Sequence, residues 1–176
     1  VLELKGDNSS FTGNTVINPR NYLIGTTSTL PSSGTITDSG ILTFAQNFNG
    51  TFPGTIAGGG SILVVEGGEV TFTGTVSPKI INDGSSIVGT SDTFHGNIQL
   101  LNNASVMFNQ PSAGTYAGNI SGSGSLIKEG VGQLTLVGVS SLTGQTTVRE
   151  GALSVQGGLP NSHVVVEKFA SLKGTG

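Results

Sequence analysis

Six copies of a short motif lie along the chain, and each reads aromatic residue or Leu, any residue, Gly, then Asn, Thr or Gln. They begin at Phe11, Phe52, Phe72, Phe94, Tyr116 and Leu142. The starts are evenly spaced, except that the gap from Phe11 to Phe52 is close to two of the others combined. A period of about 20–26 residues is typical of one turn of a β-solenoid. The spacing therefore predicts a repeat architecture and argues against a compact enzyme.

Strand patterns fill the rest of the sequence, whereas no helical periodicity persists over three turns. With 29 glycines among 176 residues, helices are further disfavoured. Short apolar runs bounded by Gly, Asn, Ser or Asp predict strands at residues 62–65, 70–72, 80–81, 98–101, 106–108, 134–136, 153–155 and 164–166. Corners of Asp, Asn, Glu or Gly predict strand pairs joined by tight turns at residues 35–44, 101–108, 147–155 and 165–172.

A longer internal repeat supports the same interpretation. Residues 41–74 align without a gap with residues 105–138, at an offset of 64, and we call this pair the long repeat. The identical positions include Phe44 and Phe108, Gly50 and Gly114, Thr51 and Thr115, Gly54 and Gly118, Ile56 and Ile120, Thr71 and Thr135, and Gly74 and Gly138. Because the offset is close to three coils, we expect the long and the short repeat to be in phase.

These repeats predict an all-β fold, a single parallel β-helix segment over residues 1–176. One coil cannot bury its apolar face alone, but stacked coils join these faces into one core. Equivalent residues then stack about 4.8 Å apart. We therefore expect an inward aromatic ladder, a Gly bend two residues after each ring, and a polar ladder of Asn, Thr or Gln after each Gly. The expected ladder contains Phe11, Phe52, Phe72, Phe94 and Tyr116.

Composition restricts the partners. Only 10% of the residues are charged and the net charge is −3, so without a basic patch we expect no nucleic-acid partner. The sequence contains no run of 18 apolar residues, so it predicts no membrane-spanning helix. Cysteine is absent. A solenoid spreads its stability over stacked coils instead of disulfides, and a chain without cysteine is consistent with export.

Residues that carry chemistry are scattered. Glu66 and Glu69 form the one close acidic pair near a corner, where they would resemble glycosidase carboxylates. Ser91, Asp92 and His95 are the residue types of a nucleophilic triad, but they lie within one short turn. The favoured interpretations are solvated corner charges and an ordinary turn, because β-helix enzymes gather several charged residues on one face.

No cofactor or metal site is expected. The chain has two histidines and no calcium-binding Gly-Gly-x-Gly-x-Asp repeat. The glycine clusters at residues 58–60 and 122–124 resemble phosphate loops, but no helix follows them, so solenoid corners explain them better. We therefore expect no catalytic, cofactor-binding or metal-binding residues. The alternative hypothesis is a carbohydrate-active β-helix, such as a pectin-lyase-like or tailspike fragment, which needs clustered Asp, Glu or Arg on one flank.

Residues 122–138 read Gly-Ser-Gly-Ser-Leu-Ile-Lys-Glu-Gly-Val-Gly-Gln-Leu-Thr-Leu-Val-Gly. With the residues that follow, up to Gly176, this segment closely resembles the passenger-associated transport repeat of bacterial autotransporters. That repeat has the form G-x-G-x-L-x-K-x-G-x-G-x-L-x-L-x-G-x-x-x-Y-x-G-x-T-x-V-x-x-G-x-L-x-V. The matching positions are Gly122, Gly124, Leu126, Lys128, Gly130, Gly132, Leu134, Leu136, Gly138, Gly144, Thr146, Val148, Gly151, Leu153 and Val155. Leu142 replaces the usual Tyr, and residues 172–176 resemble the start of a further coil. A weaker version of the repeat lies within residues 41–89.

The resemblance implies a right-handed, single-stranded parallel β-helix displayed on the surface of a Gram-negative bacterium by type V secretion. It implies a C-terminal membrane β-barrel of the same precursor, which is not in this chain. Members of the family act as adhesins, toxins or self-associating virulence factors, so the implied partners are a host receptor, matrix or glycan, or a second copy. The Phe-x-x-Asn sets at Phe11 and Phe94 also resemble chlamydial polymorphic membrane proteins, although their companion Gly-Gly-Ala-Ile motif is absent.

Overall fold

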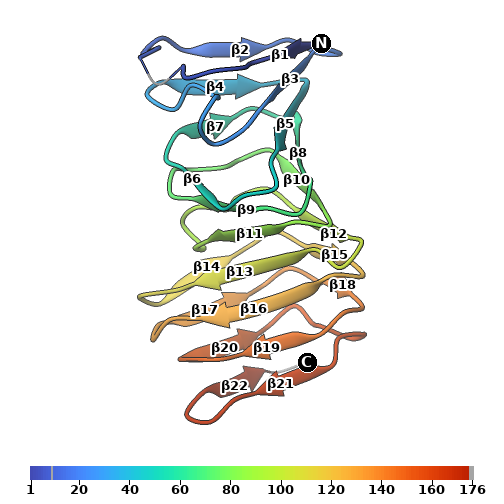
Figure 1. Cartoon of the computed structure of the whole chain (residues 1–176). Coiled ribbons are helices and arrows are strands. Elements are labelled where there is room, and N and C mark those ends of the chain that lie inside the picture. Colours follow the sequence, from blue (N-terminus) through green and yellow to red (C-terminus); the bar gives the residue numbers. More distant parts are fainter. Residues whose placement is uncertain (9, 175–176) are drawn as a thin grey trace.

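The computed structural model describes residues 1–8 and 10–174, and these fold into short parallel strands. No helix occurs in the described part of the chain, and the strands stack in about nine turns of a β-solenoid (Figure 1). The first and last strands, β1 and β22, lie at opposite ends of the stack (Figure 1). The predicted all-β parallel β-helix is therefore confirmed. Residues 175–176, where the sequence resembles the start of a further coil, lie outside the described residues.

The strands are short and follow one another through tight corners. They are β1 (Leu2–Glu3), β2 (Thr15–Ile17), β3 (Tyr22–Gly25), β4 (Thr35–Asp38), β5 (Ile41–Ala45), β6 (Gly50–Phe52), β7 (Thr55–Ala57), β8 (Ser61–Val65), β9 (Glu69–Phe72), β10 (Lys79–Asp83), β11 (Ser86–Gly89), β12 (Ile98–Leu101), β13 (Ser105–Asn109), β14 (Gly114–Tyr116), β15 (Ile120–Gly122), β16 (Ser125–Glu129), β17 (Gln133–Leu136), β18 (Ser141–Leu142), β19 (Thr146–Val148), β20 (Ala152–Val155), β21 (Val164–Val166) and β22 (Ser171–Gly174).

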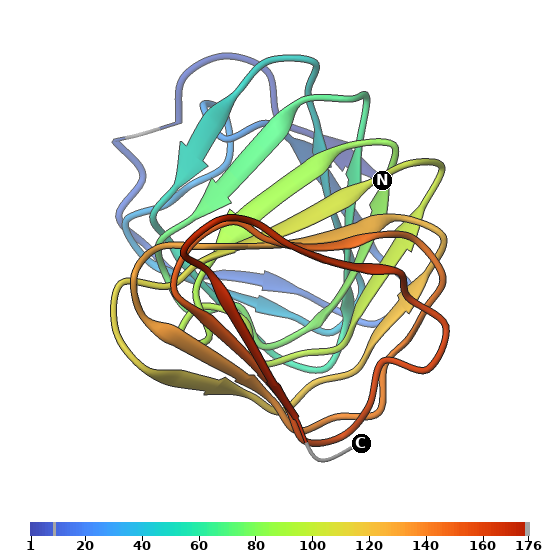
Figure 2. The same ribbon diagram turned by 90° about the horizontal axis from the view of Figure 1, so that it is seen from below.

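Four parallel sheets form the sides of the rod. Sheet A has the order β1-β3-β5-β8-β10-β12-β15-β18, and sheet C has the order β21-β19-β16-β13-β11-β9-β6. Sheet D (β14-β17-β20-β22) and sheet B (β2-β4-β7) complete the coils. Viewed from below, the coils wind around one common interior (Figure 2). Each predicted strand lies within or overlaps one of these strands.

The coils differ in length when they are measured by strand pairing. The shortest step joins Val70 to Ile87, and the longest joins Ile98 to Ile120. The spacing from Tyr116 to Leu142, the last two copies of the motif, is longer than any coil. The reason is that successive copies of the motif do not all lie on the same side of the rod. Phe52 pairs with Phe72 in sheet C, whereas Leu142 lies in sheet A.

The long repeat corresponds to three coils plus one further side of the rod. Three coils along sheet A lead from Leu42 through Ile62 and Ile80 to Ile98. The repeat equivalent of Leu42, however, is Val106, which lies beyond the next corner on β13 in sheet C. The expectation that the long and the short repeat are in phase is therefore wrong.

Every strand of the repeat moves to the next side in the same way. β5 lies in sheet A while its equivalent β13 lies in sheet C, and β6 in sheet C corresponds to β14 in sheet D. β7 in sheet B likewise corresponds to β15 in sheet A. The same local structure is thus built twice, rotated by one side around the rod.

An aromatic ladder runs through the core, as predicted for four of its five expected members. Neighbouring rings have centroids 5.1–6.4 Å apart in mostly edge-to-face contacts, a favourable arrangement. The ladder contains Phe44, Phe52, Phe72, Phe94, Phe108 and Tyr116, each at most 1% exposed. The prediction for Phe11 is wrong, because this ring is 48% exposed in the segment between β1 and β2, where no strand holds it inward.

The Gly and Asn positions of the motif stack between coils. A Cβ at Gly74 would overlap the carbonyl oxygen of Gly54, so this bend needs glycine. Asn97 Oδ1 accepts a hydrogen bond from the backbone N of Asn119 over 2.9 Å, and Asn14 Oδ1 accepts one from the N of Thr35 over 3.0 Å. The motif therefore marks close-packed corners whose polar side chains bind the next coil.

Candidate functional site

The Ser91 turn is held by a glutamine from the next coil. Gln110 Oε1 accepts a hydrogen bond from the backbone N of Ser91 over 3.0 Å, and Gln110 Nε2 donates to Ser91 Oγ over 2.8 Å. Gly114 lies so close to Ser91 Oγ that a Cβ there would overlap it. We call this arrangement the glutamine clasp.

The glutamine clasp also occurs at the equivalent position in the first copy of the long repeat. Gln46 Oε1 accepts a hydrogen bond from the backbone N of Thr27 over 2.8 Å, and Gln46 Nε2 donates to the carbonyl oxygens of Phe48 and Glu69. Gly50 leaves room for the Thr27 side chain. Both glutamines are buried. Sequence reasoning missed these residues, although both fall within the aligned copies of the long repeat.

The clasp explains why Ser91, Asp92 and His95 do not form a catalytic triad. The Ser91 side chain is buried and faces Gln110, whereas Asp92 and His95 are exposed. In the described residues, no hydrogen bond joins any two of the three side chains. The backbone N atoms of Thr93 and Phe94 instead bond to the carbonyl oxygen of Thr90, which makes the segment a tight turn. The turn is a packing element of the coil.

Glu66 and Glu69 lie at the two ends of the corner between β8 and β9. Glu66 is exposed and adopts a φ of 77°, while Glu69 begins β9 and is half-buried. No ion pair or hydrogen bond of the described residues involves either carboxylate. No basic residue of the described structure pairs with them, so this corner contains no charged cluster of the kind that a β-helix glycosidase gathers.

Lys128 is the buried cation that sequence reasoning left unassigned. Its side chain is 0% exposed and stacks between Phe108 and Val148 of the neighbouring coils. Nζ donates to the carbonyl oxygens of Glu129, Gly130 and Glu150 over 2.7, 2.6 and 3.0 Å. Burial lowers the pKa of this ammonium, although the Glu150 and Glu129 carboxylates act in the opposite direction. The Lys128 ammonium therefore joins the corner at residues 129–130 to Glu150 in the coil that follows.

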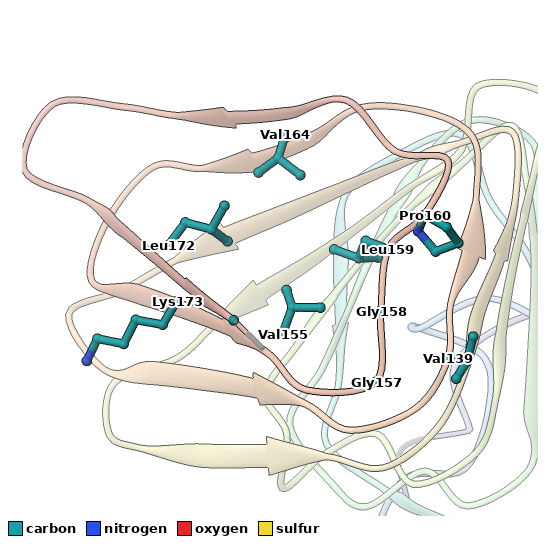
Figure 3. Close-up of a pocket in the computed structure, with 10 residues that line it drawn as sticks. Val139, Val155, Gly157, Gly158, Leu159, Pro160, Val164, Leu172 and Lys173 are labelled. Carbon is teal, nitrogen blue, oxygen red and sulfur yellow. The ribbon is translucent and has the colours of Figure 1, made fainter. Parts of the chain in front are cut away.

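A cavity of about 540 Å³ opens among β20, β21 and β22 near the C-terminal end of the rod (Figure 3). Its wall is mostly aliphatic, with Val155 from β20, Val164 from β21 and Leu172 from β22 on the inner side. Lys173 is the one charged residue among its lining residues. No Asp, Glu, His or Ser accompanies Lys173 among these lining residues, and the cavity continues the apolar interior.

The glycine clusters are corners, as predicted. Gly58 and Gly122 have φ values of 105° and 104° and lie against the carbonyl oxygens of Asp38 and Leu100 in the coil before them. Among the described residues, no group of three or more His, Asp or Glu lies close enough to hold a metal ion. A helix long and apolar enough to cross a membrane is likewise not found in that part of the chain.

No protein-family model, curated protein or solved structure matches this chain significantly.

Proposed function

We propose that this chain is part of the surface-displayed passenger stalk of a Gram-negative autotransporter. In this role the rod is a scaffold for adhesion or virulence, and its coil-by-coil folding aids its own secretion. The precursor's C-terminal translocator barrel, outside this chain, anchors it in the outer membrane. A host receptor, matrix component, glycan or second copy binds along the sides of the rod.

The observation that carries this proposal is the agreement between the transport-repeat pattern and the coil. Of the six apolar motif positions, Leu126, Leu134, Leu136, Val148 and Leu153 are at most 2% exposed, and Val155 is partly buried against the same core. The apolar motif positions thus contribute to stacking one coil on another, which is what a repeat that serves secretion and folding requires.

Glycines of the same motif form the corners. Gly122, Gly130 and Gly151 have φ values of 104°, 77° and 67°, which favour glycine. The motif lysine, Lys128, donates to three carbonyl oxygens at such a corner. A chain built from these units needs no segment from far along the sequence to form the next coil.

This local pairing gives the proposal its mechanism. Each strand pairs with strands one coil before or after it in the sequence, so a coil can dock as soon as it leaves the membrane. Stacking free energy, which is a nearest-neighbour quantity in repeat proteins, then accumulates on the outside of the cell. The folded rod holds its sides away from the membrane, where a partner reaches them.

The experiment places the chain between a signal peptide and a translocator barrel in a Gram-negative host. Leu134→Asp buries a charge in the core, while Thr135→Asp adds the same charge one residue along on the outer face of β17. We expect wild-type and Thr135→Asp chains to be displayed and protease-accessible on intact cells, and Leu134→Asp to be depleted there. Equal display of both variants would contradict the coupling of folding to secretion.

Turnover of polysaccharides distinguishes the alternative hypothesis. We expect no depolymerisation of a polysaccharide panel by the purified chain. Turnover that is abolished by Glu66→Ala or Asp92→Ala would instead support a carbohydrate-active β-helix.

A further inference from the structure

Asp38 is a carboxyl group enclosed at the corner between β4 and β5. Its side chain is 0% exposed, and Oδ1 accepts a hydrogen bond from the backbone N of Gly40 over 2.9 Å. Oδ2 is buried without a hydrogen-bond partner. The carboxyl group lies directly against Gly60, where an added Cβ would be 2.6 Å from Cγ, Oδ1 and Oδ2. The corner therefore fits the carboxyl group closely but satisfies only one of its oxygens.

No cation balances this carboxyl group from the described elements packed around it. The strands paired with β4, which are β2 and β7, contain no titratable residue, and neither do β5, β8 or residues 58–60. The nearest corner, at residues 18–21, holds Arg20, and Tyr22 begins β3. Both are exposed, and in the described residues no hydrogen bond or ion pair joins either one to Asp38.

The two protonation states differ in how well they suit this corner. A buried ionised carboxylate without a counter-charge is strongly disfavoured, whereas the neutral acid has a much smaller desolvation cost. Burial accordingly raises the pKa of Asp38 above its ordinary value of 3.8, while the hydrogen bond from Gly40 lowers it in part.

We propose that Asp38 is a pH-sensitive lock on the N-terminal coils, closed when its carboxyl group is neutral and loosened when it ionises. The effect is local, because coils of a solenoid contact only their neighbours and can open separately. The elements released are β4 and the strands paired with it, β2 and β7. This inference concerns the molecule itself and does not depend on the proposed function.

The sign of the pH dependence follows from the raised pKa. Below the ordinary pKa of 3.8 the carboxyl group is protonated in both the closed and the open coil, so the full stabilisation is present. As the pH rises toward the pKa of the closed state, the open coil loses its proton first. The opening equilibrium constant therefore increases by up to about tenfold per pH unit in this window. Above the pKa of the closed state the increase stops.

Hydrogen exchange of backbone amides between pH 4 and pH 8 tests the lock, after correction for the intrinsic pH dependence of exchange. In the full chain we expect peptides covering β2, β4 and β7 to lose protection as the pH rises, while peptides covering β17 and β20 do not. Asp38→Asn removes the titrating carboxyl group, so the protection of β2, β4 and β7 should no longer depend on pH. Asp92→Asn, which removes an exposed carboxylate, should leave this pH dependence intact.

Two results would overturn the lock. One is pH-independent protection of β2, β4 and β7 in the wild type, and the other is the same pH response in Asp38→Asn. If Asp38→Asn does not fold, the side-chain carboxyl carbon shift of Asp38 in the wild type gives a direct answer. A titration midpoint at or below the ordinary 3.8 in the folded chain would then reject the proposal.

Discussion

Phe44 and Phe108 occupy the same position in the long repeat, yet Phe44 lies in sheet A and Phe108 in sheet C. Each ring packs at 5.1 Å against the next aromatic residue of the ladder along the chain, Phe52 or Tyr116. The repeat therefore preserves its internal contacts while turning by one side of the rod. This relationship makes the two copies comparable residue by residue.

Truncation of a ladder ring should destabilise the rod. We expect Phe108→Ala to lower the free energy of unfolding by about 3–5 kcal/mol, because it removes a buried ring and leaves a cavity. The control is Phe169→Ala, whose ring is 91% exposed and whose loss should cost less than about 0.5 kcal/mol. Urea denaturation followed by circular dichroism measures both. Equal effects of the two variants would show that the ladder does not stabilise the core.

The glutamine clasp should stabilise the folded chain because its glutamine accepts a hydrogen bond from a backbone N of the preceding coil. We expect Gln110→Met to cost about 1–3 kcal/mol, since the backbone N of Ser91 is then buried without an acceptor. Gln46→Met should cost a similar amount, because Gln46 binds Thr27 in the same way. Gln145→Met is the matched control on an exposed position. A cost for Gln110→Met no larger than that of Gln145→Met would argue against the clasp.

The sequence was sufficient to predict the coil, many of the strands and four of the six rings of the aromatic ladder, whereas Phe44 and Phe108 were missed. Alternating apolar residues and corner glycines are local signals, and each is tied to one strand or one turn. Phe11 shares the motif but lacks the flanking strand that would turn its ring inward. The pattern alone does not contain that information.

The phase of the repeat was not predictable from spacing. The coils vary enough in length that the repeat offset is close to three coils by count but not by strand pairing. The roles of Gln110 and Lys128 were missed for a related reason. A buried polar side chain is recognised by the backbone groups it meets in the next coil, and those depend on register.

Two deletions should distinguish the two periods. The repeat deletion removes residues 41–104 and brings Gln110 and Gly114 into the places of Gln46 and Gly50, so that Gln110 can bind Thr27. We expect this shorter chain to fold with its β-sheet signal retained. The coil deletion removes residues 42–97 and keeps each strand on its side, but it deletes Ser91 and leaves Gln110 without its partner.

Thermal unfolding of the two shortened chains measures the difference. We expect the repeat deletion to unfold at the higher temperature, although it lacks more of the chain. Loss of all β-sheet signal in the repeat deletion, or a lower unfolding temperature than that of the coil deletion, would contradict the one-side rotation of the repeat.

Lys128 should give the rod an unusual response to alkaline pH. Because burial lowers its pKa in the folded chain, the unfolded chain binds more protons between that lowered pKa and the ordinary value of 10.5. Stability should therefore rise with pH in this window relative to Lys128→Met, which keeps the stem between Phe108 and Val148 but cannot titrate. Denaturant unfolding at pH 8 and pH 10 measures the change.

The control for this experiment is Lys79→Met, since Lys79 is exposed. The difference in unfolding free energy between wild type and Lys79→Met should show no such rise. The contrary result is a difference in unfolding free energy between wild type and Lys128→Met that stays constant or falls as the pH rises. It would mean that the hydrogen bonds to the carbonyl oxygens of Glu129, Gly130 and Glu150 raise the pKa of Lys128 more than burial lowers it.

The location of the native protein tests the proposed passenger role most directly. Intact cells of the source organism are labelled with an antibody against residues 1–176, with and without permeabilisation and after brief external protease. The account predicts labelling of intact cells that protease removes, with a membrane-embedded C-terminal fragment of the same precursor left behind. Labelling that appears only after permeabilisation would contradict it.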